Sequence, residues 1–136
     1  MSSSPDKTLA IECPVVQRSS MNQATKTFVS NFDVVVAGVV VANESSLTIY
    51  EATEYKEAGT FASSKLVIPF SSVLKVKGKR IVSTHGNYEA GRIQIFGQFD
   101  AKRGFERITM KLHPDKFCIL KVELTKYIGH SVEQMI

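Results

Sequence analysis

The sequence predicts a mostly β domain of about seven strands, closed at its C-terminal end by one amphipathic α-helix. Three observations support this prediction. Between residues 34 and 112, short apolar segments alternate with polar, glycine-containing segments, as in antiparallel sheets. Several of these segments place an apolar residue at every second position, which indicates a strand that is buried on one face. After Pro114, the apolar spacing changes to that of a helix.

The size and composition of the chain fit one domain. It has 136 residues, of which 43% are hydrophobic and 22% are charged, as in ordinary globular proteins. Residues 1–7 are rich in serine and contain Pro5, so we expect a disordered N-terminus. Residues 8–136 are then expected to form a single domain.

The first half of the chain predicts a broken strand followed by a hairpin. Residues 8–20 (TLAIECPVVQRSS) fit a short strand that is interrupted by Pro14. Residues 32–44 (FDVVVAGVVVANE) are β-branched and continuously apolar, which predicts a buried strand. Residues 46–55 (SLTIYEATEY) alternate and predict the returning strand, and residues 56–64 (KEAGTFASS) predict a loop.

The second half predicts four more strands. Residues 65–83 fit two strands separated by a kink at Pro69, with a turn at Gly78. Residues 92–99 (RIQIFGQF) and 105–112 (FERITMKL) alternate and are joined by a polar turn, which predicts a hairpin. We expect the apolar residues of this hairpin in the core: Ile93, Ile95, Phe96, Phe105, Ile108, Met110 and Leu112.

The closing helix is predicted from Pro114 to the stop signal at Gly129. Its expected inward face comprises Phe117, Leu120, Leu124, Tyr127 and Ile128, and its expected outward face comprises Lys121, Glu123 and Lys126.

This order of elements resembles the pleckstrin-homology (PH) superfamily, and more narrowly its GRAM variant. Three segments carry the resemblance: GVVVANESSLTIYE (38–51), LVIPFSSVLKV (66–76) and the last hairpin with the closing helix (92–128). The similarity covers about residues 34–129. It implies a seven-stranded, two-sheet barrel and a non-enzymatic adaptor that binds phospholipids or proteins. The loop that holds the inositol phosphate in such domains corresponds here to a region with only Arg18 and Lys26, and it lacks the usual K-x-R pattern.

Basic residues are concentrated in the second half of the sheet. Residues 65–111 contain ten Lys or Arg against three Asp or Glu. This asymmetry indicates an anionic partner. The candidate binding residues are Lys75, Lys77, Lys79, Arg80, Arg92, Lys102, Arg103 and Arg107. The alternative interpretation is a solvated sheet face, where lysines also prevent edge-to-edge pairing.

No catalytic motif, cofactor motif or metal-binding spacing is present, so we expect no enzyme, no cofactor and no metal. Cys13 and Cys118 are far apart and predict two reduced thiols, with Cys118 buried in the closing helix.

We therefore expect a cytoplasmic binding module that docks on a protein partner or on an acidic phospholipid surface, and which can contact a membrane peripherally. The alternative is an OB-like barrel that binds single-stranded nucleic acid through its basic residues and nearby aromatics. A helix that lies within the strand order, rather than after it, favours this second interpretation.

Overall fold

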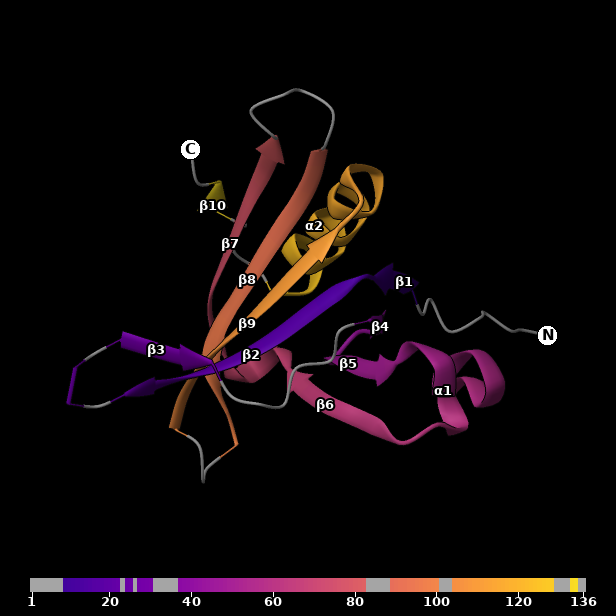
Figure 1. The fold of residues 1–136 in the computed structure, drawn as a ribbon, viewed down its shortest axis with the longest axis horizontal. Helices are drawn as coiled ribbons and strands as arrows, with labels where there is room; N and C mark the ends of the chain where they lie inside the picture. Colours follow the sequence, from indigo (N-terminus) through magenta and orange to yellow (C-terminus); the bar gives the residue numbers. More distant parts are fainter. Residues whose placement is uncertain are drawn as a thin grey trace.

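Two β-sheets pack face to face in the computed structural model, and a C-terminal helix packs against them (Figure 1). The structure describes residues 9–22, 24–25, 27–30, 37–82, 89–100, 104–128 and 133–134. The predicted fold class, mostly β with a closing helix, is confirmed.

The elements are ordered as follows. The four-stranded sheet has the order β1 (Leu9–Cys13), β4 (Gly38–Ala42), β5 (Ser46–Glu51) and β6 (Ser64–Pro69). The six-stranded sheet has the order β10 (Glu133–Gln134), β7 (Val73–Val82), β8 (Glu89–Asp100), β9 (Gly104–Leu112), β2 (Val15–Asn22) and β3 (Thr27–Ser30). Pairing is antiparallel except between β10 and β7. Two α-helices, α1 (Ala52–Ala58) and α2 (Pro114–Ile128), and two 3₁₀ turns, η1 (Gly59–Phe61) and η2 (Phe70–Ser72), complete the described elements.

One bent strand connects the two sheets. β1 pairs with β4 in the four-stranded sheet, and β2 pairs with β9 and β3 in the other. The break between them is Pro14, which cannot donate a ladder hydrogen bond. Counted once, this bent strand and β4 to β9 make the seven strands that the sequence predicts, and β3 and β10 are short additions.

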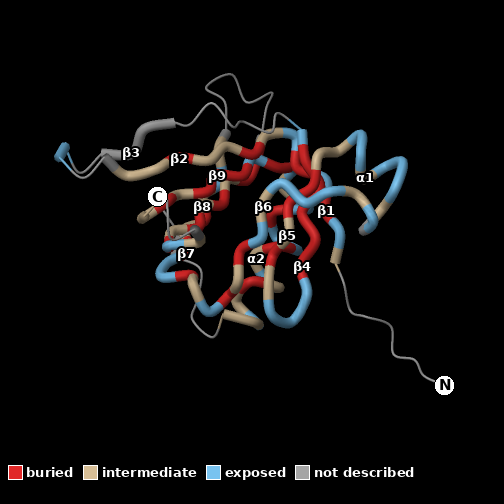
Figure 2. The backbone as a smooth tube through the Cα atoms, turned by 90° about the horizontal axis from the view of Figure 1, so that it is seen from below, coloured by how far each residue is buried: buried red, intermediate tan, exposed pale blue. Residues whose placement is uncertain are grey.

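The core fills the space between the sheets, where buried residues gather in Figure 2. Alternate residues of the central strands point into it, including Ile93, Ile95, Ile108 and Met110, each 0% exposed. α2 contributes Phe117, Leu120 and Leu124, and Tyr127 stacks on Phe70 with ring centroids 5.8 Å apart. The predicted inward face of the closing helix is therefore confirmed.

Helix α1 replaces the second half of a predicted strand. The alternation of residues 46–55 predicted a strand through Tyr55, but β5 ends at Glu51. The Glu51 carboxylate accepts hydrogen bonds from the backbone N–H groups of Thr53 (3.1 Å) and Glu54 (2.8 Å), and thereby caps the helix. These bonds lower the pKa of Glu51. Part of the predicted loop over residues 56–64 is also helical.

Strand β7 also departs from the prediction. The sequence predicted a turn at Gly78, but β7 runs from Val73 to Val82 and pairs with β8 through Gly78; the register shifts once, between Val73 and Lys75. Gly78 is buried and lies opposite Ile93. The predicted kink at Pro69 is present, because η2 separates β6 from β7.

Several other expectations concern single residues. Cys118 is exposed on α2, so its predicted burial is wrong. Both cysteines are free thiols, as predicted. The expected disorder of residues 1–7, the helix stop at Gly129 and the cations Lys102 and Arg103 lie outside the described residues.

Candidate anion-binding surface

Three lysines of β7 lie on the face of the six-stranded sheet that is turned away from the core. Val76 is 2% exposed and points inward. Because side chains alternate along a strand, Lys75, Lys77 and Lys79 point the opposite way. They are exposed or half-buried. The uninterrupted strand thus places three cations in a line.

The neighbouring strands extend this line into a surface, because residues that pair across β7, β8 and β9 form rows. In the row that contains Lys79, Arg92 of β8 and Lys111 of β9 lie side by side. In the row of Lys77 the register places Gln94 and Thr109, and in the row of Lys75 it places Phe96 and Arg107. Directly opposed side chains in such rows lie about 5 Å apart at Cβ. These rows contain six cations, which we call the basic face: Lys75, Lys77, Lys79, Arg92, Arg107 and Lys111.

Of the eight predicted binding residues, Arg80 lies on the opposite side of the sheet, and Lys102 and Arg103 lie outside the described residues. The other five lie on the basic face: Lys75, Lys77, Lys79, Arg92 and Arg107. Arg80 pairs with Gly91, on the side of the sheet that carries Phe117 of α2. Arg80 therefore does not extend the line of lysines, contrary to the prediction. The reason is that β7 continues through Gly78, so consecutive residues alternate between faces.

Lys111 belongs to the basic face but was not among the predicted residues. Its signal was present in the sequence, because Arg107, Thr109 and Lys111 alternate with the core residues Ile108 and Met110. Once the apolar positions of β9 are assigned to the core, the positions between them must face outward.

The basic face is free of acidic residues in its sequence. Residues 75–79, 92–96 and 107–111, which form it, contain no Asp or Glu. Glu106, the nearest acid on β9, is 0% exposed and points to the core side. There it forms a bidentate pair with Arg18, at 2.5 Å and 2.9 Å. At the outer edge of the sheet, β10 places Glu133 opposite Lys77 in the backbone register.

Two arginines of this surface are partly withdrawn from water. Burial lowers the pKa of the Arg107 guanidinium below its usual range, and the nearby charge of Arg92 lowers it further. The Nε atom of Arg92 is buried and makes no hydrogen bond to any part of the chain that the structure describes. Thr109, in the row between them, is 6% exposed. The centre of the surface is therefore a partly desolvated, cationic area.

An aromatic ring lies within the basic face. Phe96 was expected in the core, but it pairs with Lys75 and Arg107 on the outward side and is half-buried. The Nζ atom of Lys77 lies 5.6 Å from the centre of its ring, within the range of a cation–π contact. Phe105 was also expected in the core and is likewise half-buried rather than buried. The alternation places Phe96 outward, in phase with Arg92 and Gln94.

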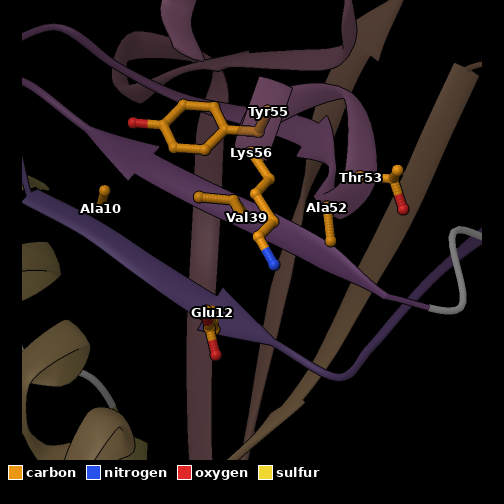
Figure 3. Close-up of a pocket in the computed structure, with 7 residues that line it drawn as sticks. All are labelled: Ala10, Glu12, Val39, Ala52, Thr53, Tyr55 and Lys56. Carbon is orange, nitrogen blue, oxygen red and sulfur yellow. The ribbon is translucent and has the colours of Figure 1, made fainter. Parts of the chain in front are cut away.

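A second candidate site lies on the other sheet, beside α1. A pocket of about 590 Å³ is lined by Ala10 and Glu12 of β1, Val39 of β4, and Ala52, Thr53, Tyr55 and Lys56. Figure 3 shows Lys56 reaching from α1 past Val39 towards the strand that carries Glu12. The floor of the pocket continues into a small apolar cluster of Val39, Val41 and Tyr50 under α1.

Cys13 of β1 is a free cysteine, and its side chain lies in the core. Burial raises the pKa of the Cys13 thiol to about 11, so this group is a weak nucleophile at neutral pH. In the described ranges, no three His, Cys, Asp or Glu side chains are grouped to hold a metal ion. The same ranges contain no helix that is long and apolar enough to cross a membrane.

No protein-family model matches the sequence, and no curated protein matches it either.

Proposed function

We propose that this protein is a PH-like, non-enzymatic binding module whose basic face docks on acidic phospholipid surfaces. The order of elements supports the PH-like assignment: a bent first strand shared by two sheets, an antiparallel meander, and a helix after the last strand. The antiparallel meander and the closing helix follow the order implied by the resemblance of residues 34–129 to PH and GRAM domains, whereas the bent first strand lies outside that range.

The single observation that carries the proposal is the register of β7, β8 and β9. It places six cations on one sheet face, within three segments that contain no acidic residue. A Lys or Arg near an anionic leaflet contributes about 1 kcal/mol of attraction. Six such residues give several kcal/mol before the costs of association, which supports reversible and salt-sensitive adsorption.

Vesicle binding across a salt series tests the proposal. We expect the protein to bind vesicles that contain phosphatidylserine, to ignore neutral phosphatidylcholine vesicles, and to dissociate as salt increases. Replacing Lys75, Lys77 and Lys79 by Gln should abolish most of this binding. The matched control replaces Lys56, Lys65 and Lys116, three exposed lysines outside the basic face, and should bind like the original protein.

Two results would contradict the proposal. Equal losses in both triple variants would show that net charge, and not the basic face, determines binding. Failure to bind acidic vesicles at low salt would exclude the lipid surface and leave an acidic protein or a nucleic acid as the occupant of the face.

A second function, binding of single-stranded nucleic acid, is supported by the position of Phe96. Its ring lies among cations, as in surfaces where bases stack and phosphates are neutralised. The short helix α1 lies within the strand order, between β5 and β6, which by the criterion given above favours this second function. The longer helix α2 follows β9, an order that differs from that of an OB fold, so we expect this function to use the sheet face directly. The Phe96→Leu variant distinguishes the two functions, because stacking contributes about 1–3 kcal/mol per base. It should weaken oligonucleotide binding at least fivefold and leave vesicle binding within twofold.

A further inference from the structure

The outward side of α2 carries exposed apolar side chains. Phe117, Leu120 and Leu124 form the buried side of this helix. On the opposite side, Ile119 is 42% exposed and Val122 is 64% exposed. Because they are three residues apart, these two side chains are neighbours on the helix surface. The helix therefore offers a second apolar surface besides the one that packs in the core.

Two charged residues extend this surface along the helix axis. Asp115 precedes Ile119 by four residues, and Lys126 follows Val122 by four residues. The resulting spacing of four, three and four residues is that of the a and d positions of a heptad, which form the seam between two packed helices. These four residues, which we call the outer stripe, thus place a helix-packing pattern on an exposed face: Asp115, Ile119, Val122 and Lys126.

The outer stripe is complementary to a second copy of itself. Its spacing is the same in both directions, and its two ends carry opposite charges. In an antiparallel pair of helices with a two-fold axis between Ile119 and Val122, Ile119 packs against the partner's Val122. The same axis places Asp115 beside the partner's Lys126. Each contact occurs twice, as in any two-fold symmetric interface. A parallel pair would instead place Asp115 beside the partner's Asp115, which is unfavourable.

The charges at the two ends of the outer stripe remain accessible to another molecule. Within one copy, the Asp115 carboxylate lies 3.7 Å from Nδ1 of His113, and the Lys126 ammonium lies 3.8 Å from the Glu123 carboxylate. The side chains of Asp115 and Lys126 are nevertheless more than half exposed, so each has room for a further partner. On one flank of the stripe, the antiparallel arrangement also brings Lys116 towards the partner's Glu123.

We propose that a second copy of this protein docks on the outer stripe, through an antiparallel and two-fold symmetric contact between the two α2 helices. The apolar area is small, so the contact belongs to the class of weak, reversible interfaces. α2 lies on the side of the six-stranded sheet where Phe117 covers Gly91, opposite the basic face. The dimer would therefore leave both basic faces uncovered, and its formation is independent of the proposed function.

Sedimentation velocity over a range of protein concentrations tests the proposal. We expect the dimer fraction to rise with concentration, with a dissociation constant on the order of 0.1 mM. Val122→Glu places a charge in the middle of the outer stripe and should raise this constant about tenfold or more. The matched control is Val67→Glu, the same change at an exposed valine that pairs with Thr48 on β5 of the other sheet. The control should dimerise like the original protein.

Reversal of the end charges tests the antiparallel arrangement. Asp115→Lys and Lys126→Asp should each raise the dissociation constant about fivefold, because two pairs of like charges then meet in each dimer. The variant that combines both changes restores opposite charges at each contact and should recover the original affinity. A combined variant that dimerises no better than the single variants would overturn this arrangement.

The thiol of Cys118 gives a second measurement on the original sequence. Cys118 is exposed beside the outer stripe, whereas Cys13 is buried. From the rise of a helix and the usual distance between packed helices, the two Cys118 thiols of the dimer would lie roughly 10 Å apart. This distance is too long for a disulfide but fits a short bismaleimide. The reagent should link two copies of the original protein and of Val67→Glu, and not of Val122→Glu.

Two further results would overturn the proposal. A protein that stays monomeric at every concentration would leave the outer stripe as a docking surface for a helix of another protein. A dimer that survives Val122→Glu, in sedimentation or in cross-linking, would show that the two copies meet through a different surface.

Discussion

Lys79 and Arg80 are adjacent in the chain but lie on opposite faces of the six-stranded sheet. Lys79 shares its row with Arg92 and Lys111, whereas Arg80 pairs with Gly91 on the side that packs against α2. A run of cations in the sequence is thus divided by strand geometry into two surfaces. Only one of these surfaces gathers further cations from β8 and β9.

This division predicts different effects for two substitutions that remove the same charge. Lys79→Gln should weaken binding to acidic vesicles about fivefold, which corresponds to the loss of about 1 kcal/mol of attraction. Arg80→Gln should change the affinity less than twofold. Sedimentation of the protein with phosphatidylserine vesicles at low salt measures both. A larger effect of Arg80→Gln would place the docking surface on the α2 side.

The buried ion pair between Arg18 and Glu106 predicts a strong dependence of stability on both partners. The Glu106 carboxylate is 0% exposed, and Arg18 supplies its two hydrogen bonds from β2. Arg18→Met would leave this carboxylate buried and unpaired, which should lower the free energy of unfolding by about 3–5 kcal/mol. Adding Glu106→Leu should restore most of the loss. Urea unfolding of the single and double variants measures the coupling, and additive losses would contradict it.

Gly91 lies where β8 meets α2, at a position with no room for a larger side chain. A Cβ atom at this position would lie 2.2 Å from Cβ of Phe117. Gly91→Ala must therefore displace the helix or the strand, and we expect a loss of about 3 kcal/mol or more in urea unfolding. Gly59→Ala is the control, since Gly59 has a φ of 60° but open space around it. It should cost about 1 kcal/mol of backbone strain. A smaller loss for Gly91→Ala than for Gly59→Ala would contradict this packing.

The two thiols differ in exposure, so we expect them to differ in reactivity. The buried thiol should also contribute to the way in which the free energy of unfolding changes at alkaline pH. A thiol reagent at pH 8 should modify exposed Cys118 rapidly and Cys13, which is 1% exposed, only on unfolding. Because burial raises the pKa of Cys13 from about 9 to about 11, the folded protein retains this proton more tightly than the unfolded chain. The stability that this provides is complete below pH 9 and is lost as the pH rises from 9 to 11.

The Cys13→Ala variant isolates this component. Over that pH range it should lose up to about 2.7 kcal/mol less than the original protein, since each pKa unit corresponds to 1.36 kcal/mol. Thermal unfolding at pH 8 and pH 11 gives the comparison. Identical pH dependence in both proteins would show that Cys13 does not contribute.

The fold could be predicted from the sequence wherever local patterns and packing agree. The alternation in β8 and β9, the break at Pro14 and the helical spacing after Pro114 each lead to the observed element. The prediction failed at Glu51 because Glu is an unusual helix cap, and at Gly78 because a glycine inside a strand looks locally like a turn. At Glu51 the outcome is determined by local hydrogen bonds from Thr53 and Glu54, whereas at Gly78 it is determined by the pairing of β7 with β8.

The candidate site was predictable in composition but not in arrangement. The excess of cations identified most of the residues, but their grouping depends on the register between three strands. That register places Arg92 beside Lys111 and makes Phe96 an outward residue. It is set by the pairing of core side chains across the sheet, which a single sequence does not specify at the level of individual neighbours.

The pairing of β2 with β9 has a consequence for how the protein is made. Val15 pairs with Lys111, so one side of the six-stranded sheet joins parts of the chain that are synthesised far apart in time. At the ribosome, the edge of β2 that pairs with β9 stays unpaired until β9 has been made, and α2, whose Phe117 packs against Gly91 of β8, can dock only later still. Contacts of this kind close large loops and fold slowly. The basic face is therefore complete only after β9 has paired with β8, and a nascent chain that lacks residues 104–112 cannot present all six cations.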